Sequence, residues 1–179
     1  EMVNPNDILF SLPTINNELP ALSENTLSDV FVITMLEDDW RQCEFFSKNQ
    51  HKEIQQEIEK IEQLKANHQK SESSQYNAYD KIHIRELADL ALLSINFKEL
   101  QAILKVKKIG AIKFENQSYY IAQGFALETD HHIYYGVLDS DNEVVETLGV
   151  RYKSDNIDEI AHVLNAFDLV YVDWCETSC

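Results

Sequence analysis

The sequence predicts an α+β fold for a single domain over residues 1–179, with a mainly helical half at 1–108 and a mainly β-sheet half at 109–179. Apolar side chains recur at helical spacing in the first half, and the period becomes two after Ile109. The chain has only 4 Gly and 3 Pro, which argues against a many-turned all-β barrel. With 179 residues, 44% of them hydrophobic, one core of ordinary size is expected.

About four helices are expected in the first half, separated by polar breaks. Apolar residues and capping residues place them at 28–46, 50–68, 76–93 and 96–104. In the second, Ile54, Ile58 and Ile61 follow one another at steps of 4 and 3, which predicts a narrow amphipathic stripe. In the fourth, Asn96 is an N-cap and Glu99 stands at the third position of a capping box.

The second half is expected to form an antiparallel meander of four strands with one helix packed on it. A hairpin over 109–122 turns at Glu115–Gln117, and two further strands cover 132–138 and 143–152. Asn156 is expected to cap a helix that runs to Phe167, and the chain then forms a terminal strand over 169–174 within or beside the sheet. The order of elements favours α+β over alternating βαβ units.

Charge is the strongest compositional signal for function. The formal net charge is −16, which argues against a general binder of nucleic-acid phosphates and favours a basic partner. Residues 1–108 hold 18 acidic and 12 basic side chains, whereas 109–179 hold 13 acidic and 3 basic, a balance of −10. The predicted sheet half therefore carries most of the excess charge.

Tyrosines alternate with these carboxylates along the predicted strands and turns. Tyrosine supplies contact area at low rotamer cost, and carboxylates steer a basic partner. The candidate partner-binding residues are Glu115, Tyr119, Glu128, Asp130, Tyr134, Asp139, Asp141 and Glu143. An alternative is a two-faced meander whose tyrosines fill the core while its acids contact water. An exposed sheet edge is a second possible docking element.

Candidates for catalysis and metal binding are few. Glu37, Asp38 and Asp39 are consecutive carboxylates that with His83 would suit a divalent metal in a hydrolase, but no recognised metal or nucleophile motif accompanies them. The three cysteines, Cys43, Cys175 and Cys179, follow no disulfide or zinc spacing. We therefore expect a protein that is not an enzyme and needs no cofactor.

The acidic, Gly-poor chain without catalytic motifs, with Val172, Asp173, Trp174 and Cys175 near its end, resembles the bacterial immunity proteins of contact-dependent growth inhibition and related polymorphic toxin systems. The resemblance implies one-to-one binding and neutralisation of a cognate basic toxin, commonly a nuclease. These proteins have many unrelated folds, so the resemblance assigns no residues.

Two other functions remain open on the sequence. One is the metal-dependent hydrolase. The other is an adaptor that binds a partner helix through the stripe of Ile54, Ile58 and Ile61. A cytoplasmic location without membrane contact is expected, because no apolar run approaches the roughly 20 residues that span a bilayer and residues 1–10 lack a signal-peptide pattern.

Overall fold

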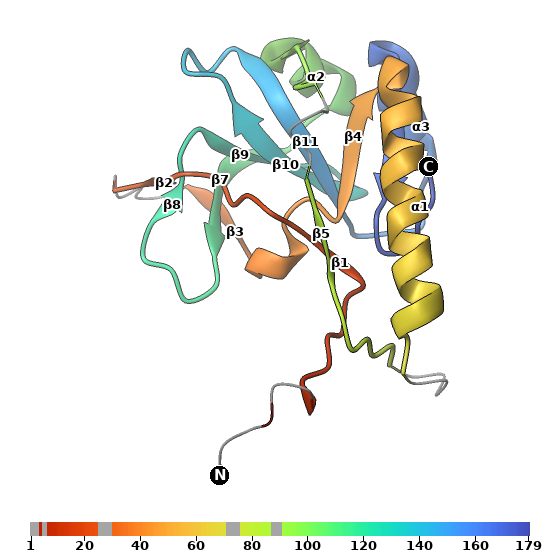
Figure 1. The fold of residues 1–179 in the computed structure, drawn as a ribbon. Helices are drawn as coiled ribbons and strands as arrows, with labels where there is room; N and C mark the ends of the chain where they lie inside the picture. Colours follow the sequence, from red (N-terminus) through yellow and green to blue (C-terminus); the bar gives the residue numbers. More distant parts are fainter. Residues whose placement is uncertain (1–3, 5–6, 25–29, 71–75, 87–90) are drawn as a thin grey trace.

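The protein, described here from a computed structural model, is built around a large mixed β-sheet. The structure describes residues 4, 7–24, 30–70, 76–86 and 91–179. Within these ranges it contains a ten-stranded sheet, a separate two-stranded sheet and three α-helices (Figure 1).

The helices are α1 (His51–His68), α2 (Phe97–Leu104) and α3 (Asp158–Phe167). The strands are β1 (Thr14–Asn16), β2 (Leu22–Ser23), β3 (Phe31–Met35), β4 (Cys43–Ser47), β5 (His83–Arg85), β6 (Ile95–Asn96), β7 (Lys108–Phe114), β8 (Tyr120–Ile121), β9 (Gly124–Glu128), β10 (His132–Leu138), β11 (Val144–Tyr152) and β12 (Leu169–Asp173). Two 3₁₀ turns, η2 (Glu37–Asp39) and η3 (Lys48–Gln50), flank β4.

The large sheet runs in the order β12-β4-β11-β10-β9-β7-β8-β2, with β3 on β7 and β6 on β11. Its pairs are antiparallel except β3 with β7, which is parallel. The β3 and β7 backbones approach closely at Gly110, where an added Cβ would lie 1.7 Å from the carbonyl oxygen of Phe31. Glycine is required at this position because any side chain would collide with β3.

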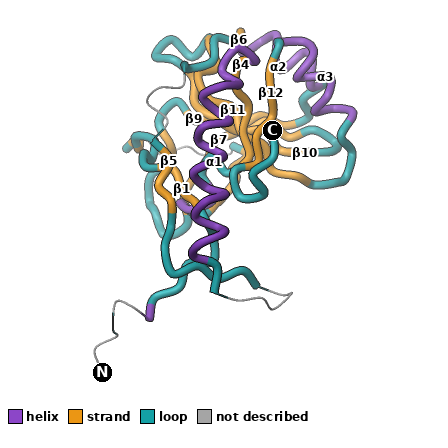
Figure 2. The backbone as a smooth tube through the Cα atoms, turned by 45° about the vertical axis from the view of Figure 1, so that its right-hand side comes forward, coloured by secondary structure: helices purple, strands orange, loops and turns teal. Residues whose placement is uncertain are grey.

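The helices cover the two faces of the sheet separately. Tyr134 points into the core under α2 and α3, whereas its neighbour Tyr135 points to the other face and contacts Trp40. On that second face α1 packs on Phe46, Val172 and Trp174 (Figure 2). Both faces are therefore buried at β4, which explains why the adjacent residues Phe45 and Phe46 are both apolar.

A buried polar centre joins β1, β4, β5 and the segment after β12. We define it as Thr14, Gln42, Glu44, Arg85 and Trp174, whose exposures are 0, 9, 1, 0 and 0%. Arg85 donates to Thr14 Oγ1 at 3.0 Å and to Gln42 Oε1 at 3.1 Å, and its guanidinium lies 5.4 Å from the Trp174 ring centroid. Glu44 accepts from Trp174 Nε1 at 2.9 Å. Burial lowers the pKa of Arg85 to about 10, so the guanidinium stays charged at neutral pH.

Several elements form where the sequence predicts them. Helix α1 buries the stripe of Ile54, Ile58 and Ile61, and α2 begins directly after Asn96, whose side chain accepts from the backbone N–H groups of Lys98 and Glu99. Helix α3 begins at Asp158, two residues after the expected cap, and strands β7, β8, β10, β11 and β12 occupy the predicted runs.

The predicted helix over 28–46 is wrong for the residues described, namely 30–46. Residues Phe31–Met35 form β3, with Ile33 and Met35 buried and Thr34 exposed, so the period is two. After η2, Arg41 adopts a left-handed backbone (φ 59°), and β4 follows. The expected helix start at Ser28 lies outside the described residues. A short apolar run rich in β-branched residues suits a strand as well as a buried helix, and pairing with β7 decides the outcome.

The predicted helix over 76–93 is also wrong in its described part. His83–Arg85 form β5, which pairs in parallel with β1, and Tyr79 makes an isolated bridge to Phe10. The remainder of that expected helix, at 87–90, is not among the described residues. The apolar spacing that predicted a helix belongs instead to the short strand β5 and the segment that leads into it.

The division into a helical half and a sheet half is therefore wrong. Strands β1–β6 and only two helices, α1 and α2, precede the sheet-rich second half within the described residues. The sequence also missed β9, which pairs with both β7 and β10 and completes the meander. The α and β elements are interleaved along the chain. In the sheet, β4 lies between β11 and β12, far from its sequence neighbours.

Candidate acidic interface

The predicted partner-binding residues do not lie on one continuous face. Glu115 and Tyr119 are exposed at the turn between β7 and β8, and Tyr119 has an exposed fraction of 45%. Figure 1 shows this turn well separated from the turn between β10 and β11, although both carry predicted contacts. The two groups therefore belong to different parts of the surface.

At the β10–β11 turn, one of the three predicted carboxylates has a structural role. Asp139 Oδ1 accepts from the backbone N–H groups of Glu143 at 2.9 Å and Val144 at 3.0 Å. The hydrogen bonds from Val144 and Glu143 lower the pKa of Asp139 and hold the turn closed. Asp141 and Glu143 have exposed side chains at this turn.

At the C-terminal end of β9, two other predicted carboxylates, Glu128 and Asp130, form ion pairs with lysines. Glu128 pairs with Lys108 at 2.9 Å and with Lys153 at 3.0 Å, and Asp130 pairs with Lys107. Hydrogen bonds from these lysines lower the pKa of both carboxyl groups. Acidic charge at this end of the sheet is thus cancelled within the protein itself.

Tyr134 is not a surface residue. Its side chain is fully buried under α2 and α3, where it stacks on Phe45 with ring centroids 6.2 Å apart. The prediction that Tyr134 contacts a partner is therefore wrong for this structure. For Tyr134 the alternative interpretation, a core tyrosine on the inner face of the meander, is the right one.

The structure brings together carboxylates from two distant segments of the chain, which we call the acidic patch: Glu37, Asp38, Asp39 and Glu115. All four side chains are exposed, and within the described residues none makes an ion pair.

The pairing of β3 with β7 explains why these residues meet. The strands are parallel and in register at Met35 and Phe114, so the residues that follow both strands emerge at the same end. Glu115 N–H donates to the Met35 carbonyl at 2.9 Å. The turn after β7 therefore lies beside η2, and two segments far apart in the sequence contribute carboxylates to one surface.

Three carboxylates of the acidic patch, Glu37, Asp38 and Glu115, line a shallow hollow of about 310 Å³. Leu36 lies in its lining with 49% of its surface exposed, and Gln117 Nε2 donates to Glu37 Oε1 at 3.2 Å across the hollow. An apolar side chain ringed by carboxylates is suited to contact a basic protein surface, because burial of Leu36 adds to charge attraction.

The acidic patch could be recognised from the sequence only in part. Glu37–Asp39 and Glu115 were each identified, the first as metal ligands and the second as a partner contact. The β-branched run Phe31–Met35 was the available signal that these residues follow a strand. Its parallel pairing with β7, which no local pattern specifies, was missed.

The metal-site interpretation of these carboxylates finds no support in the geometry. His83 Nε2 lies 2.6 Å from Glu57 Oε1, in a contact between β5 and α1. Among the described residues no group of three or more His, Cys, Asp or Glu side chains has an arrangement that could hold a metal ion. The proposed quartet of Glu37, Asp38, Asp39 and His83 is therefore not assembled.

The helix-binding interpretation of α1 is likewise not supported. Ile54, Ile58 and Ile61 have exposed fractions of 0, 4 and 0%, because they pack on Phe46 and Trp174. The stripe is an internal contact of the fold and is not accessible to a partner helix. No helix in the described part of the chain is long and apolar enough to cross a bilayer.

Comparison with known proteins gives no relative for this chain. No family model, no curated protein and no solved structure matches it. The function must therefore be inferred from the arrangement of its own residues.

Proposed function

We propose that this protein is an immunity protein that binds a cognate basic toxin, of the nuclease class, and neutralises it through its acidic surface. The acidic patch is the observation that carries the proposal. Its four carboxylates are exposed and without ion pairs in the described residues, so their charge is available to a partner.

The distribution of lysines supports this assignment. At the Glu128 and Asp130 end of the sheet, acidic charge is cancelled by Lys107, Lys108 and Lys153. At the acidic patch no comparable pairing occurs within the described chain. Since like charges repel, leaving several carboxylates together without counter-ions costs stability, and a basic partner removes that cost.

The physical mode of inhibition follows from charge. A nuclease needs a positive cleft to attract phosphate, so a protein of net charge −16 is drawn to it over a distance of several ångströms. Electrostatic steering of this kind raises association rates by a factor of about 10–10³ at low salt. Contact of Leu36 and its carboxylate ring with the rim of the cleft would then exclude nucleic acid. No nucleic-acid or membrane contact by this protein itself is part of the proposal.

The test uses a pair of charge-reversed variants with equal net charge. Asp38→Lys with Glu115→Lys reverses two carboxylates of the acidic patch. Glu59→Lys with Glu62→Lys reverses two exposed carboxylates on α1, away from it. Tagged wild-type protein and both variants are used to capture partners from native cell extract at low salt, and bound species are eluted by salt and identified by mass.

The proposal predicts one stoichiometric basic polypeptide that is inactive in the complex and nucleolytic or toxic once released. Wild-type protein and the α1 variant retain it, and the acidic-patch variant loses it. Retention by all three forms would show that the acidic patch is not the contact. Absence of any such polypeptide from the wild-type capture would overturn the immunity function.

A further inference from the structure

The outer edge of β3 is unpaired in the described part of the chain. Strand β3 pairs with β7 along one side, and no described strand pairs with it along the other (Figure 1). Edge strands of soluble proteins are usually protected by charged side chains, proline or a β-bulge. The residues of β3, Phe31–Met35, include no charged residue and no proline. This edge is therefore open to pairing with an added strand.

The register with β7 identifies which backbone groups of β3 are free. Met35 faces β7, because its carbonyl accepts from the Glu115 N–H at 2.9 Å. Consecutive residues of a strand direct their N–H and C=O groups alternately toward and away from the neighbouring strand. Ile33 therefore also faces β7, whereas Val32 and Thr34 direct their backbone groups outward. The N–H groups of Val32 and Thr34 make no hydrogen bond to any described residue.

One outward group of β3 is already held by the fold. The Thr34 carbonyl accepts from Arg151 Nη2 at 3.0 Å, a contact that ties β3 to β11. A carbonyl oxygen has two lone pairs, so it can accept a second hydrogen bond from an added strand. The Thr34 side chain is exposed, and Val30, just before the strand, has an exposed fraction of 42%. The surface beside β3 is therefore accessible to a partner.

The other margins of the sheet are less suited to strand addition. The outer edge of β12 is partly occupied, because Asp173 exchanges hydrogen bonds of 3.0 and 3.1 Å with Ser178 in the segment that follows. Strand β2, Leu22–Ser23, has only two residues. Strand β3 has five residues and, in the part of the chain that the structure describes, no comparable backbone contact along its outer edge. It is therefore the more open edge.

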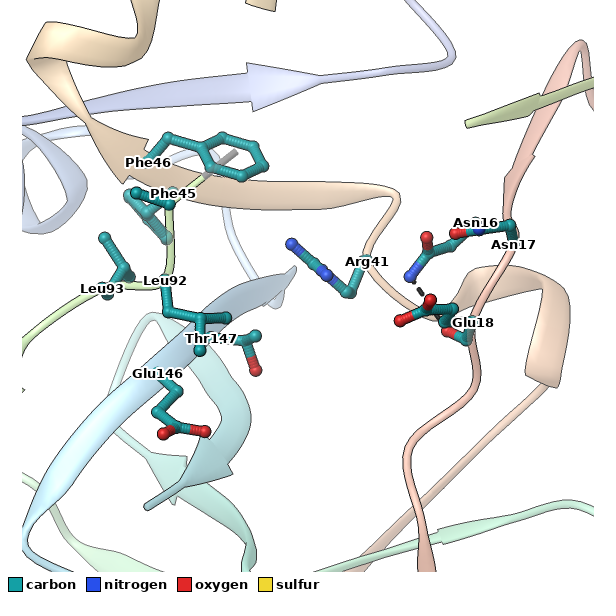
Figure 3. Close-up of a pocket in the computed structure, with 11 residues that line it drawn as sticks. Asn16, Asn17, Glu18, Arg41, Phe45, Phe46, Leu92, Leu93, Glu146 and Thr147 are labelled. Carbon is teal, nitrogen blue, oxygen red and sulfur yellow. Dashed lines mark hydrogen bonds between the residues drawn. The ribbon is translucent and has the colours of Figure 1, made fainter. Parts of the chain in front are cut away.

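The pocket between β4 and β11 is not an alternative place for an extended basic segment. Figure 3 shows Arg41, Glu18 and Glu146 among the side chains that line it. The Arg41 guanidinium lies 5.9 Å from the Phe46 ring centroid, so charges of both signs are present. The volume of about 180 Å³ is also below the range of about 300–1,000 Å³ usual for ligand pockets. This pocket is too small for a strand and offers no charge of a single sign.

The acidic patch begins directly beyond β3. Glu37 follows Thr34 by three residues, a span of at most about 11 Å. A segment that pairs with β3 and continues past Met35 would therefore bring its next side chains to the acidic patch. Basic side chains there would gain ion pairs, whereas a second copy of this protein would add its own net charge of −16 to the same surface. Charge thus favours a basic partner over self-pairing of two β3 edges.

We propose that β3 receives an extended segment of the basic partner as an added antiparallel strand. This inference rests on the proposed function and specifies how the partner is held. The antiparallel direction is favoured because its pairing is slightly more stable per residue than parallel pairing. It places the N-terminal end of the added segment beside Met35, so this segment carries Lys or Arg immediately before its paired residues. Its backbone pairs with Val32 and Thr34, and its basic side chains contact the acidic patch.

Backbone amide exchange, followed by NMR at single residues, tests the added strand in the complex with the basic polypeptide recovered by capture. In the free protein the amides of Ile33 and Met35 should exchange slowly and those of Val32 and Thr34 rapidly. In the complex, exchange at Val32 and Thr34 should slow at least about tenfold, because both N–H groups gain an acceptor. Tyr171, on the outer edge of β12, is the control and should keep its rate.

Two variants at one position separate the hydrogen bond from the shape of the edge. Val32→Pro removes the outward N–H, and proline is tolerated on an edge strand where this group faces solvent. Val32→Thr keeps the N–H and nearly the same side-chain shape. Val32→Pro should speed dissociation of the complex at least about tenfold and leave the salt dependence of association unchanged, whereas Val32→Thr should match the wild type. Urea denaturation checks that both variants are folded, and the exchange measurement on the wild type requires neither.

Two results would overturn strand addition and leave the proposed function intact. One is unchanged exchange at Val32 and Thr34 in a complex that the acidic-patch variant fails to form, and the other is equal dissociation rates for folded Val32→Pro and Val32→Thr. Slow exchange at these two amides in the free protein that becomes slower with its concentration would assign the edge to a second copy and also overturn the proposal. If the wild type captures no basic polypeptide, the proposed function and this inference both fail.

Discussion

The buried polar centre behind β4 and the acidic patch after β3 both contain carboxylates, but their surroundings are opposite. Glu44 is 1% exposed and accepts from both Arg41 and Trp174, whereas Glu37, Asp38, Asp39 and Glu115 are exposed and make no ion pair in the described residues. A buried carboxylate is committed to the fold, since its partners would be left unpaired without it. Exposed carboxylates contribute little to stability and remain available for binding.

The largest effect is expected in the buried polar centre. Glu44→Ala removes the acceptor of Arg41 Nε and Trp174 Nε1 and should lower the free energy of unfolding by about 3–5 kcal/mol. Glu59→Ala, which removes an exposed carboxylate on α1, should change it by less than about 0.5 kcal/mol. Urea denaturation of both variants measures this difference. Equal effects would show that burial does not distinguish the two regions.

The contact of α1 with the sheet should be nearly as important. Ile61 is fully buried, so Ile61→Ala should cost about 2–5 kcal/mol through lost burial and the cavity left behind. Ile157 is 70% exposed, and Ile157→Ala is the matched control with an expected change under about 0.5 kcal/mol. A small effect at Ile61 would instead restore the possibility that this stripe serves a partner.

These packing differences also explain which elements the sequence could predict. Helix α1 is predicted correctly because one polar face and one apolar stripe leave a helical period, and α2 is marked by the Asn96 cap. Strand β4 carries no such pattern, because Phe45 and Phe46 are buried on opposite faces by different helices. Adjacent buried apolar residues are compatible with a buried helix or a buried strand.

The candidate site was predictable only in its composition. The sequence identified Glu115 and the Glu37–Asp39 run as unusual, but their proximity depends on the parallel register of Met35 with Phe114. Arg41 was not identified at all, because a single arginine has no local signal. Its contacts, Glu44 on β4 and Arg85 on β5, come from different elements.

Glu57, which joins α1 to β5 through His83, is expected to make a pH-dependent contribution to the free energy of unfolding. Burial raises the pKa of this carboxyl group, but hydrogen bonds from His83 and Lys60 outweigh burial, and the net pKa is lowered. The folded state therefore favours the charged form. This stabilisation is present above the ordinary glutamate pKa of 4.5 and is lost as the pH falls through the lower folded value.

Urea denaturation of wild type and Glu57→Gln between about pH 7 and pH 3 measures this contribution. The variant should lack part of the acid-induced loss of stability below pH 4.5 that the wild type shows. Glu59→Gln, on the exposed face of the same helix, should follow the wild-type profile. Identical profiles for wild type and Glu57→Gln would contradict a role for the His83 contact.

The smallest effect on stability is expected at the acidic patch. Asp38→Lys with Glu115→Lys should change the free energy of unfolding by no more than about 0.5 kcal/mol, because these side chains are solvated and unpaired. The direction should be slightly stabilising, since the net charge of −16 becomes less negative and self-repulsion falls. A loss of several kcal/mol would show that these carboxylates, like Glu44, are committed to the fold.

The rate of association with the captured basic polypeptide tests the central claim most directly. It is measured by stopped-flow at low and high salt for the wild type, Asp38→Lys with Glu115→Lys, and Glu59→Lys with Glu62→Lys. We expect a steep fall with salt for the wild type, a rate at least about tenfold slower at low salt for the acidic-patch variant, and a smaller change for the α1 variant of equal net charge. A salt-independent rate, or equal rates for the two charge-reversed variants, would contradict the proposal that the acidic patch steers a basic partner.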